Sequence, residues 1–200
     1  MSVTARSLVL ASASPARLRL LRDAGLDPRV VVSGVDEDGV SAPDPAALVV
    51  ELARLKATAV AGQLAGDELV VGCDSMLELG GEILGKPRDA ADATERWKRM
   101  RGQSGTLLTG HAVVDVAAGR TVTGLAATRV RFGSPSDEEV EAYVASGEPL
   151  HVAGAFTLDG RSAPFVDGID GDPGNVIGLS LPLLRSLLGE LGVSITELWT

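Results

Sequence analysis

Four charged residues of this sequence stand where a charge needs a partner. Asp74 follows the apolar run Leu69–Cys73, so we expect its carboxylate at the carboxyl end of a buried strand, where open α/β sheets bind ligands. Lys56 recurs with leucine and valine at four-residue spacing, which places it on the apolar stripe of a helix. Arg17 falls in the first turn of a predicted helix, where a cation opposes the helix dipole, and Lys86 lies between a glycine and a proline. An anion such as phosphate would balance these cations.

Each of these residues also has an ordinary structural interpretation. Asp74 would then be a turn residue that begins a hairpin. The stem of Lys56 would run along the core and bring its ammonium to water. Arg17 and Lys86 would point into solvent, as most surface cations do. The residues taken one by one leave both interpretations open.

The segment Ser12–Arg17 is typical of the start of a helix that binds an anion. Apolar residues before it predict a strand, Ser14 is placed to cap the helix, and Pro15 suits the first helical position. The first backbone N–H groups of a helix have no partner within it and can bind a phosphate. An ordinary capped turn between a strand and a helix is the alternative.

Two loops carry further candidate ligands. Asp36, Glu37 and Asp38 supply clustered oxygen atoms, the ligands that Mg²⁺ and Mn²⁺ accept, although a solvated acidic loop would have the same sequence. The stretch Gly168–Gly178 is rich in glycine and could bring backbone amides close to a ligand, but it matches no Walker or dinucleotide-binding motif.

Composition restricts the class of protein. The chain has 200 residues, 45% of them hydrophobic, which suits one domain with a sizeable core. Its net charge of -9 repels nucleic-acid backbones, and no apolar run reaches the roughly 18 residues that span a bilayer. A signal-peptide pattern is also missing, so we expect a cytoplasmic protein. The single cysteine, Cys73, excludes an intramolecular disulfide and is expected to be a buried small hydrophobe.

Apolar patterns predict an α/β fold with a mixed sheet. Strands are expected over residues 7–11, 29–33 and 68–73, and helices over 15–24, 45–61, 89–100 and 181–191. A hairpin is expected over 77–84 and a second one from 106–117 and 121–132. Ser136 and Glu139 form the sequence pattern of a capping box before another helix.

Short motifs along nearly the whole chain carry a family resemblance. They are Leu10–Arg17, Val35–Glu37, Leu52–Ala57, Gly72–Ser75, Ile83–Pro87, Thr109–Gly110, Tyr143–Pro149, Ala153–Phe156 and Gly171–Leu179. In this order and spacing the chain resembles the Maf family of nucleoside triphosphate pyrophosphatases.

This resemblance implies hydrolysis between the α and β phosphates of a nucleoside triphosphate, canonical or modified, to the monophosphate and pyrophosphate. The implied fold is α/β, with a curved mixed β-sheet flanked by helices and two lobes around a deep cleft, similar to inosine triphosphate pyrophosphatases. Residues 1–200 would form a single domain of this kind, usually assembled as a homodimer.

The resemblance also implies roles for individual residues. Asp74 corresponds to the family's proton acceptor, and Glu37 corresponds to an acid that with Asp74 would hold a divalent metal, Mg²⁺ before Mn²⁺. The residues that correspond to a phosphate site are Ser12, Ser14, Arg17, Lys56 and Lys86. Such a set is coherent, since attack of water on a phosphate needs positive charge and an oriented nucleophile.

Two stretches depart from the family pattern, and both fall where subgroups differ in nucleobase preference. Where many members read Ser-Gly-Arg-Thr-His, this chain has Arg101–Gly105 with Gln103 at its centre. Where many end a second motif in glutamine, this chain has Asp159. Gln103 and Asp159 are therefore candidates for base recognition, with an ordinary hairpin aspartate as the alternative for Asp159, and the preferred base stays open.

Two other functions deserve comparison with hydrolysis. Proteins of this family have been linked to cell division and septum formation, so a nucleotide-binding regulator with weak or no hydrolysis is the alternative. A nucleic-acid-binding module conflicts with the net charge of -9 and with the small number of aromatic residues, 3% of the chain.

Overall fold

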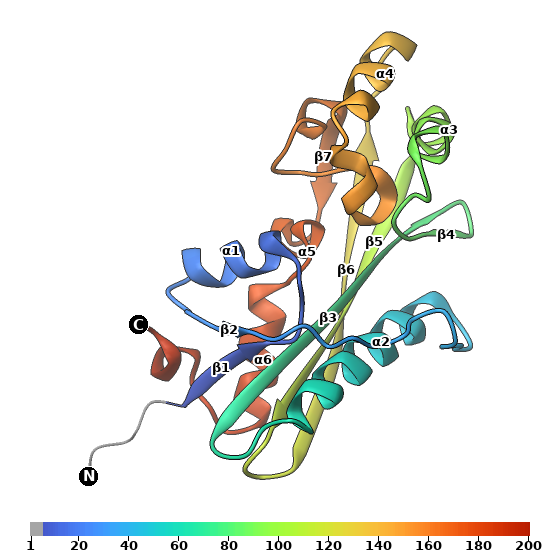
Figure 1. Cartoon of the computed structure of the whole chain (residues 1–200). Coiled ribbons are helices and arrows are strands. Elements are labelled where there is room, and N and C mark those ends of the chain that lie inside the picture. Colours follow the sequence, from blue (N-terminus) through green and yellow to red (C-terminus); the bar gives the residue numbers. More distant parts are fainter. Residues whose placement is uncertain (1–5) are drawn as a thin grey trace. The chain divides into compact units, whose positions relative to one another are not determined.

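The structure, a computed structural model, describes residues 6–200 (Figure 1). The helices are α1 (Pro15–Asp23), α2 (Pro45–Ala61), α3 (Ala90–Met100), α4 (Asp137–Ala145), α5 (Pro173–Ile177) and α6 (Leu181–Glu190). The strands are β1 (Ser7–Leu10), β2 (Arg29–Val30), β3 (Glu68–Leu79), β4 (Glu82–Leu84), β5 (Ser104–Asp115), β6 (Arg120–Phe132) and β7 (Val166–Asp170). Short 3₁₀ helices are η1 (Glu148–His151), η2 (Ala153–Ala155), η3 (Ala163–Phe165) and η4 (Ile195–Leu198).

The strands of the described residues form one mixed sheet in the order β2-β1-β3-β5-β6-β7, with β4 paired to β3. β1 pairs in parallel with β2 and with β3, whereas β4 is antiparallel to β3 and β7 is antiparallel to β6. The prediction of a mixed sheet flanked by helices is therefore confirmed. None of the described helices has the length and apolar character needed to cross a membrane.

The chain falls into two compact units. The first unit contains the residues up to Asp74 together with Thr109–Ala126 and Gly178–Thr200. The second unit contains Ser75–Leu108 and Ala127–Ile177. Each unit has its own packed interior and is described by itself.

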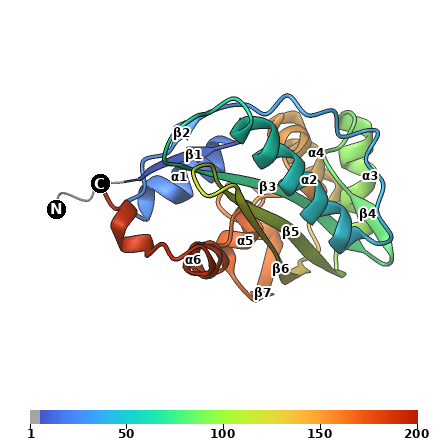
Figure 2. The same cartoon turned by 90° about the horizontal axis from the view of Figure 1, so that it is seen from below.

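In the first unit, helices cover both faces of the β1–β3 strand pair. Side chains of a strand alternate between its faces, so Leu8 and Leu10 of β1 share one cluster with residues of α1 and α6. Val9, between them, shares a second cluster with Ala53 and Ala57 of α2. Figure 2 shows α2 lying along β3 on this second face.

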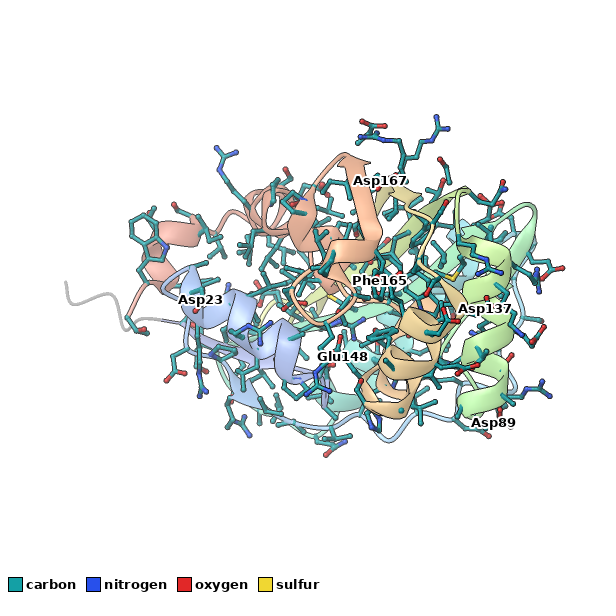
Figure 3. All side chains as sticks on the ribbon, turned by 90° about the horizontal axis from the view of Figure 1, so that it is seen from above. Asp23, Asp89, Asp137, Glu148, Phe165 and Asp167 are labelled. Carbon is teal, nitrogen blue, oxygen red and sulfur yellow. The ribbon has the colours of Figure 1, made fainter. Side chains whose placement is uncertain are left out.

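The second unit has an aromatic core around Trp97 of α3. The rings of Phe132, Tyr143 and Phe165 meet Trp97 edge-on at centroid distances of 6.0, 5.7 and 5.7 Å. Phe165, which is labelled in Figure 3, is the last residue of η3. The Trp97 indole N–H donates to the carbonyl oxygen of Ala155 at 2.7 Å, which satisfies its polar atom in the core. Edge-to-face contacts of this kind fix ring positions as well as burying area.

Local signals placed most elements correctly. The helix predicted over 45–61 is α2 with the same bounds, and Asp44 caps it by accepting from the Ala47 N–H at 2.7 Å. The expected capping box of α4 is present: Ser136 accepts from the Glu139 N–H, and the Glu139 carboxylate accepts from the Ser136 N–H. The strand expected over 29–33 is shorter, since β2 contains only Arg29–Val30.

One prediction about Asp74 is wrong. The sequence placed this residue after the end of a strand, but the structure places it inside β3, which runs on to Leu79. No glycine or proline follows Asp74 to stop the strand, and Leu77 and Leu79 continue the buried alternation.

Candidate active site

Lys56 and Asp74 form a buried ion pair in the first unit. The Lys56 ammonium lies 2.6 Å from Oδ1 of Asp74 and 2.7 Å from Oε1 of Glu37. The side chains of Lys56 and Asp74 are 11% and 9% exposed, whereas that of Glu37 is 48% exposed. The lysine on the apolar stripe of α2 thus finds its partner in two carboxylates, which come from β3 and from the loop after β2.

Two glycines let α2 approach the sheet closely enough for this contact. A β-carbon on Gly72 of β3 would lie 2.4 Å from the carbonyl oxygen of Ala53. A β-carbon on Gly110 of β5 would lie 2.1 Å from the carbonyl oxygen of Val49. Because neither distance admits a side chain, the backbone of α2 packs directly on the strands, with Lys56 one turn beyond Ala53.

The Asp74 carboxyl group has the properties of a general base. Burial raises its pKa above the ordinary value, and this effect outweighs the opposing influence of the Lys56 ammonium. Its second oxygen, Oδ2, is buried and has no hydrogen-bond partner among the described residues. A carboxylate with a raised pKa is a stronger base than a surface aspartate, and Oδ2 can accept a proton from a bound water.

The start of α1 has the predicted capping geometry. The Ser14 hydroxyl accepts from the backbone N–H of Arg17 at 3.4 Å, and Pro15 is the first residue of the helix. The Ser12 hydroxyl, which is largely buried, accepts from the backbone N–H of Ser14 at 3.2 Å. The two serines therefore order the turn between β1 and α1.

Carbonyl oxygens hold the Arg17 side chain in place. Its Nε donates to the carbonyl oxygen of Gly178 at 2.8 Å, and one terminal nitrogen donates to the carbonyl oxygen of Cys73 at 2.9 Å. The same terminal nitrogen lies 3.2 Å from the Ser12 hydroxyl oxygen. These contacts fix the guanidinium beside the residue that precedes Asp74, and its charge lowers the pKa of Asp74.

Cys73 itself is a core residue, as expected from its apolar neighbours. Its side chain is fully buried in the cluster that contains Leu10 and Leu179. Burial raises the pKa of the thiol to about 11. A thiol that stays protonated at neutral pH is a poor nucleophile, so it takes no part in the chemistry beside it.

Sequence reasoning missed His111, which is fully buried in β5. The backbone N–H of Ser180 donates to Nε2 of His111 at 2.8 Å, and Nδ1 lies 3.1 Å from the carbonyl oxygen of Thr109. Because an N–H can only donate and a carbonyl can only accept, the ring is neutral with its proton on Nδ1. His111 thereby holds the segment Gly178–Ser180, whose first carbonyl oxygen holds Arg17.

The remaining candidates lie in the second unit. Lys86 is exposed in the loop between β4 and α3, and Gln103 and Asp159 are exposed as well. The glycine-rich stretch 168–178 forms the end of β7 and the short helix α5. Its Asn175 is fully buried and donates to the carbonyl oxygen of Leu107 at 3.1 Å and to the hydroxyl of Thr128 at 3.0 Å. This stretch thus has a clear structural role.

Glu37 and Asp74, the predicted metal ligands, offer carboxylate oxygens of the kind that Mg²⁺ binds. Within residues 6–200, no group of three or more histidine, cysteine or acidic side chains is arranged to hold a metal. Glu37 and Asp74 nevertheless approach the same ammonium, and Oδ2 of Asp74 is a buried oxygen without a partner among these residues. Two carboxylates fit Mg²⁺, which is commonly bound by one or two carboxylates together with substrate phosphates.

Known structures share the fold at low sequence identity. The Ham1 protein of Staphylococcus aureus matches with a TM-score of 0.51 and 14% identity, over 97% of this chain and 94% of that one. A Ham1 protein of Coxiella burnetii matches with a TM-score of 0.51 and 15% identity, over 92% of this chain and 99% of that one. These likenesses concern the fold alone.

Sequence relatives are much closer. A protein of Streptomyces coelicolor named nucleoside triphosphate pyrophosphatase is 68% identical, over 97% of this chain and 95% of its own length. One of the same name from Streptomyces avermitilis is 67% identical, over 98% of this chain and 95% of its own length. The model of the Maf-like protein family matches residues 7–191. The resemblance in motif order is therefore confirmed, and this chain belongs to the Maf family.

Proposed function

We propose that this protein is a nucleoside triphosphate pyrophosphatase that converts its substrate and water to a nucleoside monophosphate and pyrophosphate. The observation that carries this function is the Asp74 carboxyl group, buried, with a raised pKa and one oxygen without a partner among the described residues. Lys56 contacts its other oxygen, and Arg17 donates to the carbonyl oxygen of the preceding residue, Cys73. The names and high identities of the Streptomyces relatives support the same activity.

In this mechanism Asp74 accepts the proton of the attacking water on Oδ2. Lys56 contacts the other oxygen, Oδ1, and so orients the carboxylate, and its charge opposes the rise in pKa that burial causes. The water oxygen forms a new bond to the α phosphorus while the anhydride bond between the α and β phosphates breaks. The electrons of the broken bond leave with pyrophosphate. The proton ends on the Asp74 carboxyl group and is then released to solvent.

Cationic side chains and the start of α1 supply the groups that would bind the substrate phosphates. Arg17 is held rigidly by the Gly178 and Cys73 carbonyl oxygens, and Ser12 and Ser14 order the turn whose amides begin α1. A helix start binds phosphate through such amides. We assign phosphate contacts to Ser12, Ser14, Arg17, Lys56 and Lys86.

A divalent cation, Mg²⁺ before Mn²⁺, completes the proposal, with Glu37 and Asp74 as the residues that would hold it. Because Glu37 and Asp74 offset the charge of Lys56, the cationic side chains alone supply less positive charge than a triphosphate needs. A bound Mg²⁺ would neutralise further phosphate charge and would make a water more acidic. Titration calorimetry with Mg²⁺ and a non-hydrolysable triphosphate should show weaker metal binding in Glu37→Gln and unchanged binding in the neighbouring control Asp38→Asn.

We assign base recognition to Gln103 and Asp159 and propose a homodimer, both on the strength of the family resemblance. We also propose a cytoplasmic location, as expected from the sequence. Residues 1–200 then act as one nucleotide pyrophosphatase domain. Light scattering after gel filtration gives the mass in solution, and a monomer would contradict the dimer.

The function is tested by incubation with a panel of canonical and modified nucleoside triphosphates and Mg²⁺, with chromatographic analysis of the nucleotide products. Monophosphate and pyrophosphate in equal amounts are expected, and Asp74→Asn should abolish their release while keeping the circular dichroism spectrum. Diphosphate with orthophosphate would contradict the proposed bond cleavage. Tight binding without turnover under any metal would support a nucleotide-binding regulator instead.

A further inference from the structure

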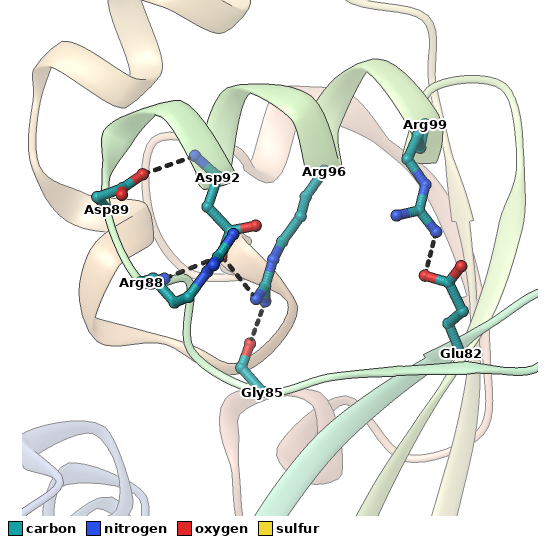
Figure 4. A network of polar contacts seen from close by, with 7 residues as sticks. All are labelled: Glu82, Gly85, Arg88, Asp89, Asp92, Arg96 and Arg99. Atoms are coloured by element: carbon teal, nitrogen blue, oxygen red, sulfur yellow. Dashed lines mark hydrogen bonds and ion pairs between the residues drawn. The ribbon is translucent and has the colours of Figure 1, made fainter.

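In the second unit, Asp92 and Arg96 of α3 hold the backbone on both sides of Lys86. One terminal nitrogen of Arg96 donates to the carbonyl oxygen of Gly85 at 2.7 Å, and the other donates to Oδ2 of Asp92 at 2.8 Å. The same Asp92 oxygen accepts from the backbone N–H of Arg88 at 2.9 Å. Figure 4 shows these contacts joining Gly85 and Arg88 to one turn of α3.

This arrangement is partly buried. The side chains of Asp92 and Arg96 are 15% and 12% exposed, and hydrogen bonds in which one or both groups are charged are stronger than neutral ones. The Arg88 N–H, followed by the Arg96 guanidinium, lowers the pKa of Asp92. Asp92 is therefore ionised over the whole range in which enzymes usually work.

A further contact fixes the same carbonyl group. The Gly85 carbonyl oxygen also accepts from the backbone N–H of Gly154 at 3.1 Å, so two donors hold it. Pro87 restricts the backbone on the other side of Lys86 and is buried, whereas Lys86 is exposed. The backbone around Lys86 is thus fixed while its ammonium faces solvent.

We propose that Asp92 and Arg96 are positioning residues that hold Lys86 in the conformation in which it binds substrate phosphate. This inference rests on the proposed function, because it takes Lys86 as a phosphate ligand. Lysine has a long flexible stem, and ordering such a stem costs on the order of 1.5 to 2 kcal/mol of entropy. A fixed backbone at the base of the stem reduces the number of positions that the ammonium must search.

The same helix provides a matched control. Arg99 lies one turn beyond Arg96 and pairs with Glu82, but within the described chain it has no hydrogen bond or ion pair to residues 85–88 (Figure 4). Its side chain is 50% exposed and that of Glu82 is 59% exposed. Arg99→Gln changes the charge of α3 by the same amount as Arg96→Gln.

The test is a double-mutant cycle on nucleoside triphosphate hydrolysis, with kcat and KM measured separately. Arg96→Gln should raise KM on the order of tenfold with a smaller change in kcat, and Arg99→Gln should leave both unchanged. In the Lys86→Ala background, Arg96→Gln should have no further effect on KM, because the residue through which it acts is gone. Asp92→Asn should behave like Arg96→Gln.

The possible outcomes distinguish failure of the proposed function, of the role of Lys86 and of the role of Arg96. If wild-type protein releases no pyrophosphate, the proposed function is wrong. If Lys86→Ala leaves KM unchanged, the role of Lys86 is wrong and the inference fails with it. If Lys86→Ala raises KM but the effect of Arg96→Gln persists at full size in that background, Arg96 acts on general stability and the inference alone is overturned. Should Arg96→Gln fold poorly, Asp92→Asn in both backgrounds decides the question in the same way.

Discussion

Gly72 lies against the backbone of Ala53, so closely that a β-carbon on Gly72 would stand 2.4 Å from the Ala53 carbonyl oxygen and 2.8 Å from the Ala57 backbone nitrogen. Real β-carbons do not approach backbone atoms to this extent. The contact sets the height of α2 above β3 and with it the reach of Lys56 to Asp74. A glycine two positions before Asp74 is thus part of the reason why the ion pair forms.

Gly72→Ala should therefore lower stability and activity together. Overpacking of this kind costs about 1–3 kcal/mol, and the displaced α2 carries Lys56 away from Asp74. Thermal unfolding and pyrophosphate release measure the two effects. Gly189→Ala is the control, since a β-carbon on Gly189 in α6 would meet no atom within 4 Å and an alanine there favours the helix. A Gly72→Ala protein with wild-type activity would show that the close approach is not needed.

The pH dependence of kcat/KM should report the environment of Asp74. Because burial raises its pKa, activity should be lost on acidification at a pH above the value of about 3.9 that is typical of an exposed aspartate. Lys56 lowers the pKa of Asp74 and Glu37 raises it. Lys56→Met should thus move the acidic limb to higher pH, and Glu37→Gln should move it to lower pH. Shifts of equal sign in both variants would exclude Asp74 as the titrating group.

The same shift has the opposite effect on folding. The native Asp74 carboxyl group holds its proton more tightly than the unfolded chain does, so its ionisation costs stability as the pH rises through the raised pKa. Asp74→Asn removes this cost. Urea unfolding at neutral pH should show an inactive variant that is at least as stable as wild type, and a large loss of stability would contradict the assignment.

Asp115 should contribute stability with the opposite pH dependence. Arg6 donates to both of its oxygens at 2.9 and 2.7 Å, and these hydrogen bonds lower the pKa of Asp115. A lowered pKa gives stability that is present above the unfolded pKa and is lost as the pH falls through the native one. Asp115→Asn should destabilise by about 1–3 kcal/mol at pH 7 and by less at pH 3. Asp67→Asn, at the exposed partner of Arg6, should have a much smaller effect.

His111 should be replaceable only by a residue that accepts at the position of Nε2. The amide oxygen of glutamine can reach that position and accept from the Ser180 N–H, whereas asparagine reaches only to the position of Nδ1. His111→Gln should retain most of the activity, and His111→Asn should raise KM because Gly178 no longer holds Arg17 firmly. If both variants lost activity equally, in proportion to a fall in melting temperature, His111 would serve only in packing.

Local sequence signals predicted the elements well and the site only in part. The helical stripe placed Lys56 on the apolar face of its helix but left open whether the ammonium reaches water or an anion, because its partner Asp74 is 18 residues away and on another element. The apolar run up to Cys73 identified the strand, but a polar residue inside a strand looks the same as one at its end. The capping pattern alone predicts Ser14 as the N-cap of α1 and Pro15 as its first residue, and the structure confirms both.

Contacts between distant segments explain what was missed. His111 meets Ser180 across 69 positions of the chain, and no local pattern marks such a pair. The tight approach at Gly72 is also invisible, because a glycine in an apolar strand suggests no particular neighbour. The ion pair of Asp92 and Arg96 is different, because an acidic and a basic residue four positions apart on a helix can be predicted to pair. The sequence spacing does not predict their contacts to Gly85 and Arg88.

Because Cys73 is buried, the rate at which its thiol reacts with a reagent measures local unfolding around it. It is the one cysteine of the 200-residue sequence, and it lies directly before Asp74 in β3. With its pKa raised to about 11, the thiol can react with an aromatic disulfide reagent only while the surrounding strand and helices are transiently separated. The labelling rate therefore measures how often the neighbourhood of Asp74 opens to solvent, and a bound nucleotide that tightens this neighbourhood should slow the reaction without any engineered label.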